Sequence, residues 1–170
     1  TKQWTTLMEV ITGFIYTLLY TNLVTECFKL IVGRPRPIYY ALHIFSKVFE
    51  DDREHYDDQA RKSFPSGHSS LSMAAWAYIA FILLADARAI KKDKPVIAWI
   101  LAHIAGGGLM FALWIGSTRI TDYWHHTSDV VTGLILGGAI AFSVYSTLVD
   151  CAWRKTPKQD TLLEKEYDQV

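Results

Sequence analysis

Three short motifs contain the side chains best suited to chemistry. Together they supply three cations, a hydroxyl beside a glycine, two histidines and a carboxylate. Cations of this kind bind anions, and a histidine beside a carboxylate can act as a nucleophile or as a proton carrier. The motifs are Lys29-x6-Arg36-Pro37, Pro65-Ser66-Gly67-His68 and Arg119-x5-His125-x3-Asp129.

The cations predict a site for a tetrahedral anion. Lys29, Arg36 and Arg119 would repel one another around an empty apolar pocket, but they suit a phosphate. An arginine fork matches two phosphoryl oxygens at once, and a lysine adds a point charge. Ser66 and Gly67 lie where a helix is expected to begin, and free N–H groups at a helix amino end favour an anion. We therefore expect these five residues to form a phosphate cradle.

The histidines predict covalent catalysis at that cradle. His125 and Asp129 are four residues apart and share one helix face. A carboxylate bonded to one ring nitrogen fixes the tautomer and leaves the other nitrogen free to attack phosphorus. His68, on a different helix, is placed to protonate the leaving oxygen. His126 points about 100° away from His125 on a helix, so we expect at most a supporting role for it.

The elements that must position these motifs are membrane helices. Segments close to ~20 residues long and free of charge are what a bilayer of ~30 Å demands. Four such segments hold 76 of the 170 residues, and all 34 charges lie in the other 94. The segments are Val10–Thr25, Ser69–Ala85, Val96–Thr118 and Val130–Val149. We therefore predict an all-α integral membrane bundle with spans at about 7–27, 69–85, 96–118 and 130–149. A soluble all-α protein is the alternative, but soluble helices average only ~11–12 residues.

Several residues inside the spans predict how the helices pack. The run Gly106–Gly108 and the pair Gly133 and Gly137 are typical of membrane helices in close contact. His103 lies inside the third span, where we expect a neutral hydrogen bond to another helix. Glu26, three residues before Lys29, is expected to pair with it.

The loops predict the orientation. Both termini and the 86–95 connection lie on one side and are rich in lysine and arginine. The positive-inside rule places that side in the cytoplasm, so the 33–68 and 119–129 loops with the site face the exterior or a lumen. We expect residues 1–150 to form the membrane core and 151–170 a cytoplasmic polar tail. The acidic 50–58 stretch is interpreted as a solvated loop.

The overall composition excludes several classes of function. Seventeen basic residues balance seventeen acidic ones, so the chain lacks the basic surplus of a nucleic-acid binder. Two cysteines cannot form a four-cysteine zinc site or a disulfide-rich scaffold. The expected partners are the bilayer and a lipid phosphate, with a homo-oligomer or a larger membrane complex as a further possibility.

The motif spacings resemble the three-part signature of the type 2 phosphatidic acid phosphatases, and more narrowly the eukaryotic lipid phosphate phosphatases. Similar signatures occur in glucose-6-phosphatases and in soluble vanadium haloperoxidases. The resemblance covers about Thr21 to Asp129. It implies the phosphate cradle named above, His68 as general acid, and His125 as a nucleophile that forms a phosphohistidine with Asp129 as its partner. It also implies a reaction without metal or cofactor, and the sequence contains no carboxylate cluster suited to magnesium.

The chain departs from the family pattern in two ways. The third motif usually opens with Ser-Arg, whereas Thr118 precedes Arg119 here. A threonine hydroxyl can make the same hydrogen bond, so Thr118 is expected to support the site. The family's membrane enzymes commonly have six spans, and the two absent here would precede Thr1. Because the chain begins with Thr1 and not Met, we expect it to be processed or truncated.

Three functions fit this sequence. The favoured one is a membrane phosphatase for lipid phosphate monoesters such as phosphatidate, lysophosphatidate, sphingosine 1-phosphate or ceramide 1-phosphate. A polyprenyl diphosphate phosphatase needs the same cradle. A non-catalytic membrane subunit of a larger complex could keep the fold and bind headgroups without turnover. The charge-free segments disfavour a soluble haloperoxidase-like enzyme.

Overall fold

The described part of the protein is entirely helical. The structure, a computed structural model, describes residues 2–39, 44 and 60–149. It contains the α-helices α1 (Lys2–Val32), α4 (Gly67–Ile90), α5 (Pro95–Thr121) and α6 (Thr127–Val144), and α6 continues into the π-helical segment η1 (Tyr145–Val149). These described ranges include no strand.

Four of the described segments are long and apolar enough to cross a membrane. They are Leu7–Val32, Gly67–Ile90, Pro95–Thr121 and Thr127–Thr147. The prediction of an all-α integral membrane protein with four spans is therefore confirmed for the described residues. The predicted 151–170 tail and the acidic 50–58 stretch lie outside them.

The helices extend beyond the charge-free segments that predicted them. α1 continues to Val32, so Lys29 lies in its last turn. α4 begins at Gly67, which places His68 in its first turn. Charged residues mark where the hydrocarbon core of the bilayer ends, whereas backbone hydrogen bonds decide where a helix ends. A helix can therefore continue past the core, because polar side chains are tolerated in a terminal turn at the membrane–water interface. The site residues are thus mounted on helix ends.

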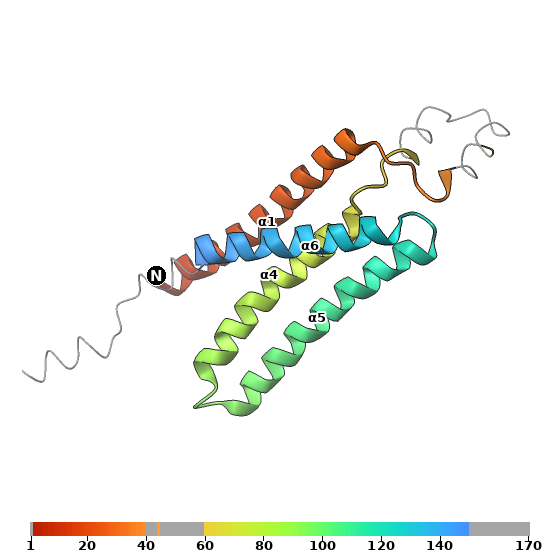
Figure 1. The fold of residues 1–170 in the computed structure, drawn as a ribbon. Coiled ribbons are helices and arrows are strands. Elements are labelled where there is room, and N and C mark those ends of the chain that lie inside the picture. Colours follow the sequence, from red (N-terminus) through yellow and green to blue (C-terminus); the bar gives the residue numbers. More distant parts are fainter. Residues whose placement is uncertain (1, 40–43, 45–59, 150–170) are drawn as a thin grey trace, which may run out of the picture.

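α4 is the central element of the bundle. It packs against α1, α5 and α6, and α6 crosses it (Figure 1). The carboxyl ends of α1 and α5 and the amino ends of α4 and α6 lie toward the same end of the molecule. The short connection between α4 and α5 lies at the other end. This topology brings the three motifs to one end of the bundle.

Glycine allows the close contact between α4 and α6. A Cβ atom at Gly133 would lie 2.6 Å from the Ser66 carbonyl oxygen, and one at Gly137 would overlap the Ser70 carbonyl oxygen. This confirms the predicted role of the glycine pair. The predicted packing of the triple glycine is only partly right, because Gly108 packs on Trp76 whereas Gly106 and Gly107 have nothing near their Cβ positions. Three consecutive helical residues point in different directions, so a single neighbour covers only one of them.

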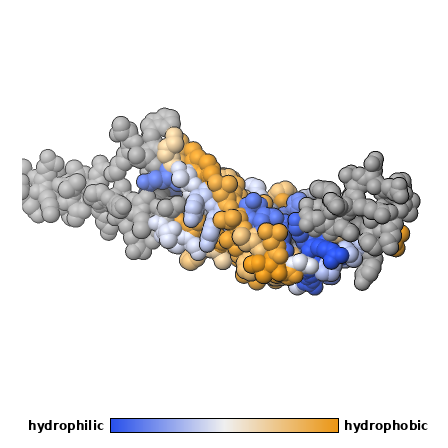
Figure 2. All heavy atoms as spheres, turned by 90° about the horizontal axis from the view of Figure 1, so that it is seen from above, coloured by the Kyte–Doolittle hydropathy of each residue, from blue (hydrophilic) through white to orange (hydrophobic). Residues whose placement is uncertain are grey.

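The outer surface is apolar along the spans. Many large hydrophobic side chains are exposed, including Leu30 at 71% and Ile31 at 78%. Figure 2 shows hydrophobic residues across the middle of the molecule and a large group of hydrophilic residues toward its right-hand end. Such a surface suits hydrocarbon and not water.

His103 corrects one expectation about the spans. Its Nδ1 lies 2.8 Å from the Trp99 carbonyl oxygen one turn earlier, and its ring lies on the Trp99 ring. The hydrogen bond is therefore made within α5 and not to another helix. His103 is exposed, so in the described part of the chain its own helix backbone provides the hydrogen-bond partner.

Candidate active site

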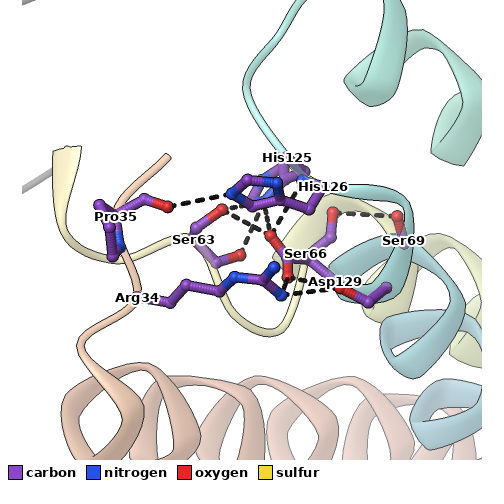
Figure 3. Close-up of polar contacts among 9 residues, drawn as sticks. Arg34, Pro35, Ser63, Ser66, Ser69, His125, His126 and Asp129 are labelled. Atoms are coloured by element: carbon purple, nitrogen blue, oxygen red, sulfur yellow. Dashed lines mark hydrogen bonds and ion pairs between the residues drawn. The ribbon is translucent and has the colours of Figure 1, made fainter. Parts of the chain in front are cut away.

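Asp129 is the buried centre of the site. It has no solvent exposure and accepts hydrogen bonds from one backbone group and from three side chains, of which Ser128 is the most distant at 3.5 Å (Figure 3). Arg34 Nη1 lies 2.7 Å from Oδ1, while Ser63 Oγ and the His126 backbone nitrogen donate to Oδ2 at 2.6 and 3.0 Å. A buried carboxylate is stable only when it is paired and hydrogen-bonded in this way. Asp129 is thus held in one fixed orientation.

His125 is held by Ser63 more directly than by Asp129. The imidazole is 4% exposed, and its Nδ1 lies 2.7 Å from the Ser63 carbonyl oxygen. A carbonyl only accepts, so this contact requires the proton on Nδ1 and leaves Nε2 as the unprotonated nitrogen of the neutral ring. Asp129 Oδ2 lies 3.9 Å from Nδ1, which is too long for a hydrogen bond. The expected orientation of His125 is present, but Ser63 supplies the hydrogen bond that was expected from Asp129.

The backbone also fixes the position of His125. The Arg119 carbonyl oxygen accepts hydrogen bonds from the backbone nitrogens of Trp124 and His125, both at 3.2 Å. The turn between α5 and α6 therefore carries the histidine back toward the arginine that precedes it by six residues.

The predicted cations act electrostatically on His68. This histidine is exposed in the first turn of α4, and four groups act electrostatically on its imidazole. They are Arg119, His125, Lys29 and Arg36, which come from three other segments of the chain. The structure thus brings together the residues that were selected from separate motifs.

Two of these cations already have carboxylate partners. Lys29 Nζ lies 2.7 Å from Glu26 Oε1, as predicted, and Arg119 Nη2 lies 3.0 Å from Asp122 Oδ2. The pairing of Glu26 with Lys29 is therefore confirmed, and the pairing of Arg119 with Asp122 is a further contact of the same kind. Because Glu26 and Asp122 are about half exposed, these pairs are weak and can be exchanged for another anion.

Arg36 lies against an aromatic ring. Its guanidinium carbon is 4.7 Å from the centroid of the Trp124 ring, and its backbone nitrogen donates to the Ala60 carbonyl oxygen at 2.8 Å. Burial lowers the pKa of Arg36 from its ordinary value, and the charge of Asp129 opposes that shift. A half-buried cation in this setting favours an anion beside it.

The beginning of α4 offers fewer free donors than expected. The Ser66 backbone N–H donates to the Asp129 carbonyl oxygen at 3.0 Å, which joins α4 to α6. The first hydrogen bond inside α4 runs from Ser70 N–H to the Ser66 carbonyl, so the orphan N–H groups of the first turn begin at Gly67. A Cβ at Gly67 would lie 3.1 Å from Lys29 Nζ, so glycine leaves room for this cation.

Thr118 accepts hydrogen bonds from the side chain of its neighbour Arg119. Its Oγ1 accepts hydrogen bonds from Arg119 Nε and Nη2 at 3.3 and 3.2 Å. The threonine hydroxyl therefore helps to orient the arginine.

Two residues of the site, Arg34 and Ser63, were not predicted from the sequence. Arg34 lies inside the first motif, and Ser63 precedes the second by two residues. Arg34 could have been predicted in one way: a carboxylate that is buried, as Asp129 is, requires a positively charged partner. The role of Ser63 could not be predicted from its residue type, because its backbone carbonyl makes the contact with His125 and every residue has such a carbonyl.

The fold and the site define a helical membrane protein that gathers cations and two histidines at one end of its bundle. Within the described residues, no group of three or more His, Cys, Asp or Glu side chains is arranged to hold a metal ion.

Comparison with known proteins identifies the family. The PAP2 superfamily matches residues 10–153, so the chain belongs to this family. It is 31% identical to "Lipid phosphate phosphatase 1" of Arabidopsis thaliana over 79% of this chain and 43% of that protein. It is 29% identical to human "Phospholipid phosphatase 2" over 94% of this chain and 58% of that protein. It is 30% identical to "Probable diacylglycerol pyrophosphate phosphatase 1" of Schizosaccharomyces pombe over 85% of this chain and 54% of that protein.

The chain spans about half the length of the curated relatives it matches. No solved structure matches it.

Proposed function

We propose that this chain carries the catalytic core of a membrane phosphatase that hydrolyses lipid phosphate monoesters through a phosphohistidine on His125. The observation that supports this most strongly is the arrangement around His125. Its Nδ1 is bound by the Ser63 carbonyl, and the ring lies within electrostatic reach of His68. A nucleophilic nitrogen, a second histidine and several cations are thus gathered at one place.

Phosphate binding is the first step of the proposed reaction. The substrate phosphate takes the place of the exposed carboxylates beside Lys29 and Arg119, and it lies against Arg36. The free N–H groups at the beginning of α4 add donors for the same oxygens. These groups neutralise charge on the phosphoryl oxygens, and that stabilisation increases as the transition state forms.

Transfer to histidine is the second step. The lone pair of His125 Nε2 forms a bond to phosphorus as the bond from phosphorus to the lipid oxygen breaks. His68 gives its proton to that oxygen, so the lipid leaves as an alcohol. Water then attacks the phosphohistidine, His68 takes a proton from it, and inorganic phosphate and free His125 are restored.

Asp129 stabilises the phosphorylated ring in this scheme. His125 gains positive charge when Nε2 bonds to phosphorus, and Asp129 Oδ2 lies 3.9 Å from its Nδ1. The carboxylate keeps its place because Arg34 and Ser63 hold both of its oxygens. No metal ion takes part in these steps as proposed.

The surroundings of the site favour a lipid substrate. Leu30 and Ile31 project from the last turns of α1, next to Lys29, with most of their surface exposed. An acyl chain can therefore remain in the bilayer while its phosphate reaches the cations at the helix ends. We propose phosphatidate and its relatives lysophosphatidate, sphingosine 1-phosphate and ceramide 1-phosphate as the substrate class, with the site on the extracellular or luminal side.

A lipid diphosphate is a second candidate substrate. One relative is named a probable diacylglycerol pyrophosphate phosphatase, and the same cradle binds a terminal phosphate of a polyprenyl diphosphate. A non-catalytic subunit is the alternative outside the enzymes.

The decisive experiment measures phosphate release from phosphatidate by the purified protein in detergent with EDTA present. We expect turnover by the parent protein and a loss of at least about a thousandfold in His125→Asn, because the nucleophile is removed. His126→Asn is the matched control, since His126 is adjacent to the proposed nucleophile, its Nε2 lies 3.3 Å from the Pro35 carbonyl oxygen, and asparagine suits its N-cap position on α6. Rapid acid-free quenching with ³²P-labelled substrate should trap label on the parent protein and not on His125→Asn.

Other outcomes separate the alternatives. Full turnover by His125→Asn would remove the histidine mechanism. Binding of phosphatidate without turnover by the parent would support the subunit function. Faster turnover of a polyprenyl diphosphate than of phosphatidate would transfer the assignment to that substrate.

A further inference from the structure

A cavity lies at the opposite end of the bundle from the candidate active site. It occupies the angle between the last turns of α4 and the first turns of α5 and has a volume of about 340 Å³. Its lining includes Ala87, Ala98, Pro95 and Trp99 together with two cations, Arg88 and Lys91. The volume falls within the ~300–1,000 Å³ range of ligand sites.

The cavity is well separated from the phosphate site. His68 lies in the first turn of α4 and Arg88 in its last turn, and the helix has 24 residues. At 1.5 Å per residue the helix is about 35 Å long, which is close to the thickness of the bilayer. The cavity therefore lies at the other membrane face and belongs to the other leaflet.

Small side chains create the apolar part of the cavity. Ala87 and Ala98 are almost fully buried, at 7% and 6% exposure, where α4 and α5 approach each other. Their methyl groups leave space that larger residues would fill. Trp99 is largely exposed beside this space, as tryptophan often is at a membrane boundary.

The charged side chains that line the cavity are positive. Arg88 lies in the last turn of α4, and Lys91 is the C-cap residue three positions later with helical backbone angles, so both project to the same side. Both are exposed, and the lining that the described residues form contains no acidic side chain. A cation pair beside an apolar space is complementary to an anionic amphiphile.

We propose that this cavity binds an anionic phospholipid from the leaflet opposite to the active site. Arg88 and Lys91 contact the phosphodiester, and the space over Ala87 and Ala98 takes the beginning of an acyl chain. The headgroup lies at the level of the short α4–α5 connection, where the span ends and water begins. The proposal is independent of the phosphatase mechanism, because none of these residues contributes to the phosphate site.

Lipid binding to the purified protein tests this proposal. Phosphatidylglycerol is the probe, because it is an anionic phosphodiester and offers no monoester to the phosphatase site. Native mass spectrometry should show retention of phosphatidylglycerol over zwitterionic phosphatidylcholine, and phosphatidylglycerol should raise the unfolding temperature. R88Q/K91Q should lower the affinity for phosphatidylglycerol by about fivefold for each cation, or about 25-fold in all.

Two further variants separate this site from general charge effects. K92Q/K94Q removes the same charge from the same connection without changing the cavity lining, and it should retain phosphatidylglycerol as the parent does. Ala98→Leu fills the apolar space with no change of charge, and it should also weaken retention.

Three results would overturn the proposal. The first is equal retention of phosphatidylcholine, and the second is an equal loss in K92Q/K94Q. The third is stabilisation by phosphatidate but not by phosphatidylglycerol, which would place the lipid at the phosphate site. A lower unfolding temperature of R88Q/K91Q without lipid would report only the loss of cations from a helix carboxyl end, so the lipid-dependent increment is the deciding quantity.

Discussion

At the scale of single residues, Arg34 and Ser63 hold the buried carboxylate of Asp129 in place. Asp129 is buried without exposure, and its two oxygens are bound by these two side chains at 2.7 and 2.6 Å. Ser63 reaches His125 as well, through its backbone carbonyl. Ser63, 62 positions before His125, therefore positions the proposed nucleophile, and Arg34, 95 positions before Asp129, fixes the carboxylate beside it.

Replacing Arg34 by Gln should lower kcat by about 10- to 100-fold with a smaller change in KM, because Asp129 loses its charge partner but the phosphate cations remain. The Arg34 side chain is 36% exposed, so we expect a loss of only about 1–2 kcal/mol in the free energy of unfolding, well below the cost of breaking a fully buried pair. The measurements are steady-state kinetics on phosphatidate and thermal unfolding in detergent.

Arg61→Gln is the control for Arg34, since Arg61 is exposed and contacts only Tyr39 among the partners described. It should leave kcat unchanged. A rise in KM at constant kcat in Arg34→Gln would instead make Arg34 a substrate-binding residue.

At the scale of elements, the contact between α4 and α6 decides whether the motifs meet. The second motif begins α4 and the third runs into α6, and the backbones of these helices touch at Gly133 and Gly137. The Ser66 N–H bond to the Asp129 carbonyl closes the same contact at the site end. Any increase in the helix separation would therefore move Ser66 away from Asp129.

Gly137→Ala should destabilise the protein by about 1–3 kcal/mol, because the new methyl group overlaps the Ser70 backbone carbonyl and the helices must separate. Gly107→Ala is the matched control in α5, where the methyl group meets nothing within 4 Å and alanine favours the helix by up to about 1 kcal/mol. Thermal unfolding of both variants in the same detergent is the test. Equal stability of the two would contradict the close approach of α4 and α6.

At the scale of the whole molecule, the membrane separates two sets of charge. The active-site cations lie at one end of the bundle, and the cations of the α4–α5 connection lie at the other end. The orientation predicted from the basic residues assigns the α4–α5 connection to the cytoplasm and the site to the opposite side.

Cysteine labelling in sealed vesicles of known orientation tests this assignment. In a background with Cys27→Ser and Cys151→Ser, an impermeant maleimide should label Thr121→Cys from the extracytoplasmic side. It should label Lys92→Cys only from the cytoplasmic side, because the reagent does not cross the bilayer. The reverse labelling pattern would invert the predicted topology.

The sequence by itself determined the helices, their number in the described residues and the motif residues. Transfer of a segment into a bilayer depends on its own length and side chains, so a charge-free stretch such as 96–118 reports its structure without any neighbour. The pairing of Glu26 with Lys29 was equally local, because one helical turn separates them.

The tertiary structure alone decided which residues contact one another across the bundle. It placed Arg34 and Ser63 against Asp129, and it placed the His125 Nδ1 against the Ser63 carbonyl. It also packed Gly108 against Trp76 and left the Cβ position of Gly107 without a neighbour within 4 Å. It also formed the cavity between α4 and α5. These contacts join residues on different helices or depend on which face a helix turns to its neighbour, and no pattern along a single chain segment contains that information.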